Sequence, residues 1–112
     1  MNQKRFSPRL KADRIGADAA RDLAETAFGF LAEDPERLSR FASVTGFDIA
    51  NARHAVAEPG FHAGVLGYLL SDEAVLLDCA GAVEVAPVSF ALAYRAIPGG
   101  DPTLEISMEA FR

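Results

Sequence analysis

Apolar residues recur three and four positions apart in the first part of the chain, a spacing that places them on one face of a helix. The first such stripe consists of Ala20, Leu23, Ala24, Ala27, Phe28 and Leu31. Asp18 precedes it, and an aspartate in that position can accept a hydrogen bond from the first turn. The pattern therefore predicts a first helix capped by Asp18.

Two further helix starts are marked by aspartate. The run Asp34-Pro35-Glu36 supplies an N-cap acceptor, a proline at the first helical position and a carboxylate near the positive end of the helix dipole. Gly46 is suited to end this second helix in a left-handed conformation. Asp48 is expected to cap a third, shorter helix, which Pro59 stops.

The chain resembles itself when it is shifted by 38 residues. Residues 28–34, Phe-Gly-Phe-Leu-Ala-Glu-Asp, then align with residues 66–72, Leu-Gly-Tyr-Leu-Leu-Ser-Asp. A repeat of this length is typical of a tandem helical unit. The match predicts two three-helix units, residues 18–57 and residues 59–97.

The second unit contains the most apolar stretch of the chain. Ser71-Asp72-Glu73 begins a helix there as residues 34–36 do in the first unit. Residues 74–83 follow and are apolar on nearly every side except at Asp78. A helix that is hydrophobic all round is usually buried, so this segment is predicted to be the central helix.

The C-terminal third fits two periods. Val88, Ala91, Leu92 and Arg95 have helical spacing, whereas Val88, Phe90, Leu92 and Tyr94 alternate as in a strand. Residues 98–102, Pro-Gly-Gly-Asp-Pro, are compatible with a hairpin turn. Residues 88–97 are therefore helix or strand by pattern alone. The repeat favours a sixth helix, with residues 98–112 as a tail that is either loose or a hairpin.

Together these elements indicate an all-α fold, a compact bundle of five to six short helices in a single domain over residues 16–97. The 112 residues, 50% of them hydrophobic, suffice for one core.

The net charge of −5 is unevenly distributed. Residues 1–15 hold five basic side chains against one acidic, whereas residues 16–112 hold six against fifteen. The first segment is expected to be a flexible basic arm, able to contact phosphates or an acidic partner.

Three segments resemble an uncharacterised bacterial family of small all-helical proteins, a domain of unknown function. They are residues 29–38, Gly-Phe-Leu-Ala-Glu-Asp-Pro-Glu-Arg-Leu, then Thr-Gly-Phe-Asp at 45–48 and Leu-Leu-Ser-Asp-Glu at 69–73. The resemblance covers residues 23–77. It implies a helical fold and a protein of the bacterial cytosol, and it carries no activity, ligand or catalytic residue.

No catalytic, cofactor or metal constellation is visible. His54 and His62 are the only histidines, and neither has a second His or a Cys at the three- or four-residue spacing of a zinc site. Cys79 is the single cysteine and is expected in the core. Gly64 and Gly67 are interpreted as a close contact between helices. The sequence therefore predicts no enzyme, no cofactor and no bound metal.

Two binding roles remain, and the favoured one is a non-catalytic protein-interaction or adaptor module. Tandem helical units bury one face and present another to partners. The partner is expected to be another protein or a second copy of the chain, since Phe90 and Tyr94 are too apolar to be left exposed. No segment approaches the length of a membrane span, and a cytoplasmic location is expected.

The alternative is nucleic-acid binding through a helix-turn-helix-like segment, residues 38–56. Its second helix would present Asn51, Arg53 and His54 to the major groove, and the basic arm would contact phosphates. The acidic body counts against this hypothesis, because duplex binding normally requires several cations.

Overall fold

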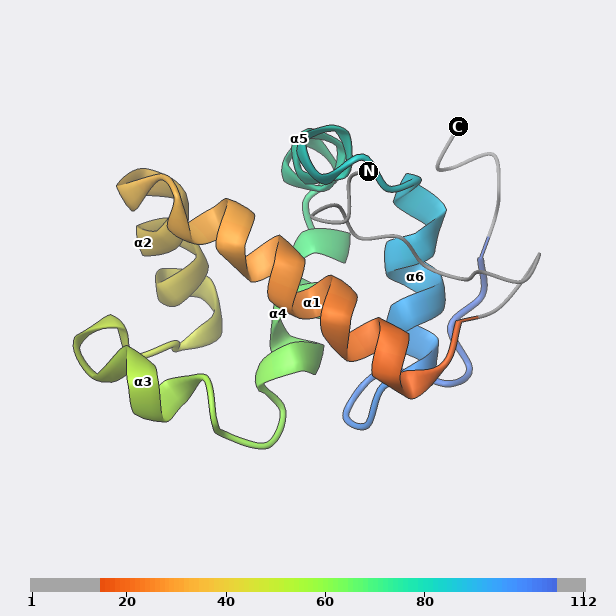
Figure 1. Cartoon of the computed structure of the whole chain (residues 1–112), viewed down its shortest axis with the longest axis horizontal. Coiled ribbons are helices and arrows are strands. Elements are labelled where there is room, and N and C mark those ends of the chain that lie inside the picture. Colours follow the sequence, from red (N-terminus) through yellow and green to blue (C-terminus); the bar gives the residue numbers. More distant parts are fainter. Residues whose placement is uncertain (1–14, 107–112) are drawn as a thin grey trace, which may run out of the picture.

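The computed structural model of the protein describes residues 15–106, and this part of the chain forms helices and no strand. The helices are α1 (Ala17–Ala32), α2 (Pro35–Thr45), α3 (Ala52–Ala55), α4 (Phe61–Leu70), α5 (Glu73–Val83) and α6 (Pro87–Ala96), with a 3-10 turn, η1 (Ile49–Asn51), directly before α3 (Figure 1). The predicted all-α bundle is confirmed. The helical alternative for residues 88–97 is correct and the strand is wrong. The expectations for residues 1–14 and 107–112 lie outside the described residues.

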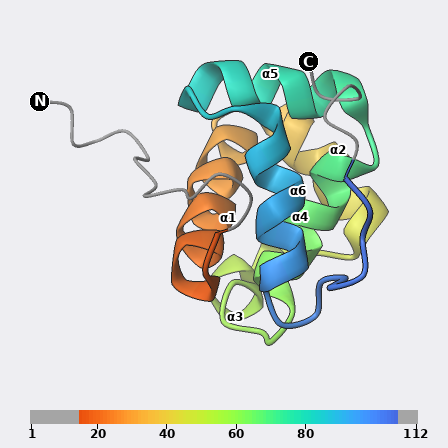
Figure 2. The same ribbon diagram turned by 90° about the vertical axis from the view of Figure 1, so that its right-hand side faces the viewer.

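Three helices make the centre of the bundle. α1, α4 and α6 pack against one another, while α5 lies across one end of them and α2 lies beside α1 and α4 (Figures 1 and 2). The largest fully buried side chains include Leu23 and Leu31 on α1, Leu66 and Leu69 on α4, and Phe90 on α6. α1 belongs to the first predicted unit, and α4 and α6 belong to the second. The helices of both units therefore share one core.

The 38-residue shift is visible in the helix boundaries. α2 and α5 each have eleven residues and start 38 positions apart. The side chains of their N-caps, Asp34 and Asp72, accept hydrogen bonds from the backbone N–H groups of Glu36 at 2.9 Å and Val75 at 3.4 Å. Both helices end in a left-handed residue, Gly46 with φ 84° and Glu84 with φ 62°.

The two units differ after these helices. Pro87 opens the ten-residue α6, whereas the corresponding residue 38 positions earlier, Ile49, opens only η1 and the four-residue α3. Asp48 stands at the N-cap of η1, but its side chain makes no capping hydrogen bond. The predicted third helix is therefore short and broken.

The prediction that Asp18 caps the first helix is wrong. α1 begins at Ala17 with Gly16 as its N-cap, and no side chain caps it. Asp18 lies inside the first turn and forms an ion pair with Arg21. A carboxylate there still interacts favourably with the positive end of the helix dipole.

The prediction that the helix over residues 74–83 is the most buried is also wrong. α5 buries three residues, Leu76, Cys79 and Ala80. Leu77 on the same helix is 45% exposed. α4 buries five of its ten residues, Ala63, Val65, Leu66, Tyr68 and Leu69. α4 is the more buried helix because it packs against both α1 and α6, whereas α5 covers one end of the bundle.

The two glycines of α4 behave differently. A Cβ on Gly67 would lie 3.3 Å from the hydroxyl oxygen of Tyr94, so Gly67 marks a close contact between α4 and α6, as predicted. A Cβ on Gly64 would meet nothing within 4 Å, so this half of the interpretation is wrong. Phe90 is fully buried, and it therefore gives no reason for self-association.

Among residues 15–106, no single helix is long and apolar enough to cross a membrane. α5 and residues 88–96 of α6 reach that length and composition only as a pair, and this pair is bent by 98°.

Candidate functional site

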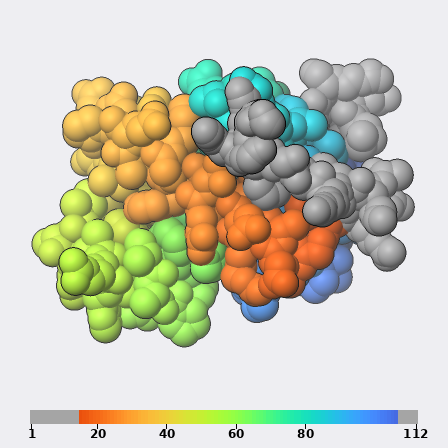
Figure 3. All heavy atoms as spheres, in the orientation of Figure 1, coloured from red at the N-terminus to blue at the C-terminus, as the bar shows by residue number. Residues whose placement is uncertain are grey.

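A cleft of about 380 Å³ opens where α2 ends, η1 and α3 pass, and α4 begins. This part of the molecule forms the yellow and green lobe beside α1 in Figure 3. Three aromatic side chains line it, Phe41, Phe47 and Phe61. The cleft therefore combines a hollow shape with an apolar wall, which is the usual character of a binding pocket.

The aromatic rings come from four different segments. Phe28 of α1, Phe41 of α2, Phe47 of the following loop and Phe61 of α4 form an aromatic cluster. Phe28 lies 5.1 to 5.9 Å, between ring centroids, from each of the other three. Such tilted and edge-on contacts are the favourable geometry for aromatic pairs. The cluster gives the cleft a wall held from several sides.

Local backbone chemistry places Phe47. Gly46 adopts φ 84°, a conformation that glycine reaches without the steric cost of a side chain, and the chain turns away from α2 there. The hydroxyl of Thr45 donates to the carbonyl oxygen of Phe41 at 2.8 Å and accepts from the N–H of Phe47 at 3.2 Å. These two bonds connect the end of α2 to the loop and keep Phe47 against the cluster.

The rim of the cleft is polar and exposed. It includes Asp48, Asn51, His54 and Glu58. His54 Nε2 lies 3.4 Å from a carboxylate oxygen of Glu58, one turn further along. Among the described residues, no three His, Cys, Asp or Glu side chains are placed to hold a metal ion.

Large apolar side chains are exposed on the segment that builds the cleft. Residues 15–106 contain four such side chains, and three of them belong to the segment that builds the cleft: Val44 is 64% exposed, Ile49 44% and Val56 37%. Most apolar side chains of this size elsewhere in the described chain are buried or partly buried. Exposed apolar side chains concentrated in one segment are typical of a surface that another molecule covers.

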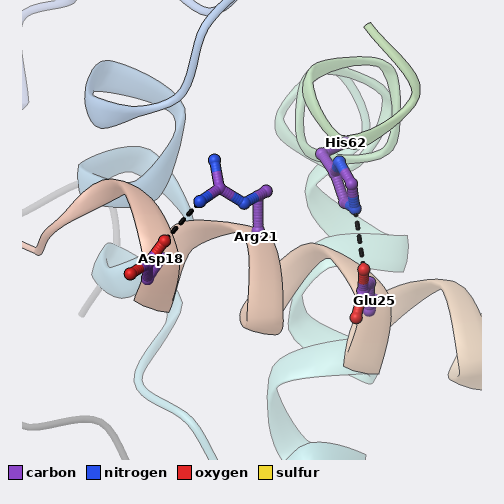
Figure 4. Close-up of polar contacts among 4 residues, drawn as sticks. All are labelled: Asp18, Arg21, Glu25 and His62. Atoms are coloured by element: carbon purple, nitrogen blue, oxygen red, sulfur yellow. Dashed lines mark hydrogen bonds and ion pairs between the residues drawn. The ribbon is translucent and has the colours of Figure 1, made fainter. Parts of the chain in front are cut away.

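The structure does not bring the two histidines into one site. His54 lies on α3 at the rim, while His62 on α4 points to Glu25 of α1, with His62 Nε2 2.9 Å from a carboxylate oxygen (Figure 4). The pair joins α1 to the first turn of α4, directly beside Phe61. It therefore supports one wall of the cleft from the outside.

The helix-turn-helix hypothesis depends on the segment after Gly46. Asn51, Arg53 and His54 are exposed there, but α3 is only four residues long. At 1.5 Å per residue this is about 6 Å of helix, a single turn. The structure thus does not form the second helix that would enter a major groove.

Cys79 lies in the core, as predicted. Burial raises the pKa of its thiol to about 12, an effect that the nearby Arg37 guanidinium partly opposes. A thiol in this environment is a packing group and not a nucleophile.

We expect Cys79 to resist alkylation by iodoacetamide in the folded protein near pH 8 and to react readily in denaturant, because only the thiolate reacts. Its folded pKa exceeds the ordinary value of 9.0, so the unfolded state loses this proton first. The contribution of Cys79 to stability is therefore complete below pH 9 and falls as the pH rises toward 12.

Urea unfolding of wild type and Cys79→Ala at several alkaline pH values measures this slope, which should be shallower in the variant. Burial also raises the pKa of Tyr68, which is why the comparison with Cys79→Ala is needed. Equal alkylation rates in the folded and unfolded protein would contradict the assignment.

Sequence patterns do not reveal the cleft. Phe28 belongs to the apolar stripe predicted for the first helix, and Phe47 belongs to no predicted helix face. The available signal is the density of aromatic residues, since five of the eight phenylalanines lie between residues 28 and 61. Four of these five meet in the aromatic cluster.

Comparison with known proteins gives one finding. The model of the family described as "Protein of unknown function (DUF3572)" matches residues 17–100. Neither the curated proteins nor the solved structures contain a significant match. The matched region includes all six helices and the whole cleft, and it extends beyond the residues 23–77 that carry the resemblance noted from the sequence. The chain therefore belongs to the DUF3572 family of proteins of unknown function.

Proposed function

We propose that this protein is a non-catalytic protein-interaction module, and that its cleft binds a peptide segment with one large apolar side chain flanked by basic residues. The observation that carries the proposal is the preformed aromatic wall, built by a segment that also exposes Val44, Ile49 and Val56. Recognition of peptides commonly uses such a hollow for an anchoring side chain. A volume of about 380 Å³ is near the lower end of ligand pockets, which suits a side chain.

The charge of the described residues indicates which residues should flank the anchoring side chain in the partner. Residues 15–106 hold fourteen acidic and five basic side chains, and Asp48 and Glu58 stand at the rim. A surface of one sign attracts segments of the other and speeds their association. We therefore expect lysine or arginine next to the anchoring residue of the partner.

We propose no catalytic step, cofactor or metal at the cleft. We also propose that the protein acts in the cytosol of a bacterium, in keeping with the resemblance of residues 23–77 and with a single thiol that is buried and unpaired with another cysteine. The partner is expected to be another protein.

The test is selection of peptides from a random display library on the immobilised full-length protein. Enriched peptides should share a Phe, Leu, Ile or Met next to Lys or Arg. Their affinity should fall at least about tenfold, or 1.4 kcal/mol, for the variant Gly64→Leu. Gly64 lines the cleft and has open space at its Cβ, so leucine there fills the cleft and also favours the helix.

Gly81→Leu is the matched control. Gly81 also lies within a helix with open space at its Cβ, but it is on α5 and away from the cleft. Peptides should bind this variant as they bind wild type. If no peptide is enriched, or if Gly64→Leu binds the selected peptides unchanged, the cleft is not a peptide site.

A further inference from the structure

Two polar side chains that line the cleft make no bond within the described part of the chain. Asp48 and Asn51 precede η1 and α3, and neither side chain forms the capping hydrogen bond that these residue types usually supply. Asp34 and Asp72, in the same position before α2 and α5, do form it. Within residues 15–106, Asp48 and Asn51 also lack a side-chain ion pair or any other side-chain hydrogen bond. Their polar groups are therefore available to a molecule in the cleft.

The backbone places these two side chains next to each other. The N–H of Asn51 donates to the carbonyl oxygen of Asp48 at 3.1 Å and closes a 3-10 turn. Side chains three residues apart eclipse one another in such a turn. Asp48 and Asn51 therefore lie on the same side of the segment, directly after Phe47 of the aromatic cluster.

The remaining polar groups of the rim are engaged with one another. His54 Nε2 lies 3.4 Å from a carboxylate oxygen of Glu58. Arg53, the basic residue of the same segment, is not among the residues that line the cleft. Asp48 is therefore the rim carboxylate that has no partner of its own in the described part of the chain.

The chemistry of these two groups suits an extended peptide. A side-chain amide carries both a donor and an acceptor, so Asn51 can bond an N–H and a C=O at once. In an extended chain these two groups of one residue point to the same side, as they do where strands pair. In a helical peptide they are already bonded within the helix. The carboxylate of Asp48 can pair with the flanking lysine or arginine.

We propose that the cleft binds its peptide in an extended conformation, with Asn51 bonded to the main chain beside the anchoring side chain and Asp48 paired with the flanking basic residue. The inference rests on the proposed function, because the anchoring side chain must occupy the cleft. It adds the conformation of the partner and the two residues that select it.

Backbone methylation of the peptide tests the role of Asn51. A peptide selected on the wild-type protein is made in versions that each carry one N-methyl group in place of a main-chain N–H. One methyl group beside the anchor should weaken binding to wild type about fivefold, the value of one hydrogen bond. The same methyl group should leave the affinity for Asn51→Ala unchanged. The other methylated positions are the controls, because they should affect both proteins equally.

The role of Asp48 is tested by repeating the selection of peptides on Asp48→Asn, which removes the charge and keeps the size. Enriched peptides should retain the apolar anchor and lose the preference for lysine or arginine. A peptide selected on wild type should bind this variant about threefold more weakly, as expected for one exposed ion pair. Asp78→Asn is the matched control, since Asp78 is exposed on α5 and does not line the cleft. If both variants lose the preference equally, net charge selects the peptide and the role of Asp48 is overturned.

Failure of this inference is distinguishable from failure of the proposed function. If Gly64→Leu weakens peptide binding but no N-methyl group distinguishes wild type from Asn51→Ala, the cleft is the site and the role of Asn51 is overturned. A helical conformation of the bound peptide, seen by transferred nuclear Overhauser effects, would overturn the extended binding mode. If no peptide is enriched on the wild-type protein, the proposed function falls and this inference falls with it.

Discussion

The variant Phe41→Ala should lose about 3 to 5 kcal/mol of its free energy of unfolding. Phe41 is 2% exposed, and its ring contacts three others, with centroid distances of 5.9 Å to Phe28, 5.4 Å to Phe47 and 5.3 Å to Tyr68. Truncation removes these contacts and leaves a cavity that α1, α2 and α4 cannot all close. Since domains are stable by only about 5 to 15 kcal/mol, the variant should be close to unfolding.

Val44→Ala is the control for this experiment. Val44 lies on the same helix and is 64% exposed, so its truncation should change stability by no more than about 0.5 kcal/mol. Urea unfolding followed by circular dichroism measures both variants. A loss below about 1 kcal/mol for Phe41→Ala would mean that the aromatic cluster does not hold α2 in place.

Leu66→Ala should cost about 2 to 5 kcal/mol, because Leu66 is fully buried at the centre of α4. α4 packs against α1 and α6 at once, so the cavity would lie between three helices. The expected loss is measured by the same urea unfolding, with the slope of the transition compared to confirm that the folded state is still compact.

Leu77→Ala gives the matched comparison, since the same side chain is removed from a site that is 45% exposed. Its loss should be under about 1 kcal/mol, because less apolar area returns to water. If both leucines cost the same, α5 would be as central as its apolar sequence suggests, and the order of burial described above would be wrong.

The sequence predicts best the features that depend on neighbouring residues. Asp34 and Pro35 define the start of α2, and Gly46 defines its end, because capping and left-handed backbone are local chemistry. Pro87 likewise starts α6. For the residues that follow it, the repeat favours a helix over a strand. These signals do not require knowledge of the rest of the fold.

The features that depend on distant contacts are not predictable in this way. The apolar sequence of α5 is compatible with burial on any side, and only the positions of α1, α4 and α6 leave Leu77 exposed. The aromatic cluster at the cleft brings together four rings from four segments, and no periodicity within one segment reports that they meet. Asp18 fails as a cap because Gly16, a residue without a polar side chain, occupies the N-cap position instead.

The packing of α1 against α4 and α6 determines when the chain can fold during synthesis. α1 ends at Ala32, but the last of the helices that cover it ends at Ala96, 64 residues later. Ribosomes add about 5 to 20 residues per second, so the interval lasts roughly 3 to 13 s. During this interval only α2, and later α4 and α5, are available to pack against the apolar stripe of α1. We therefore expect part of the apolar stripe of α1 to remain uncovered in the newly made protein until α6 has been synthesised.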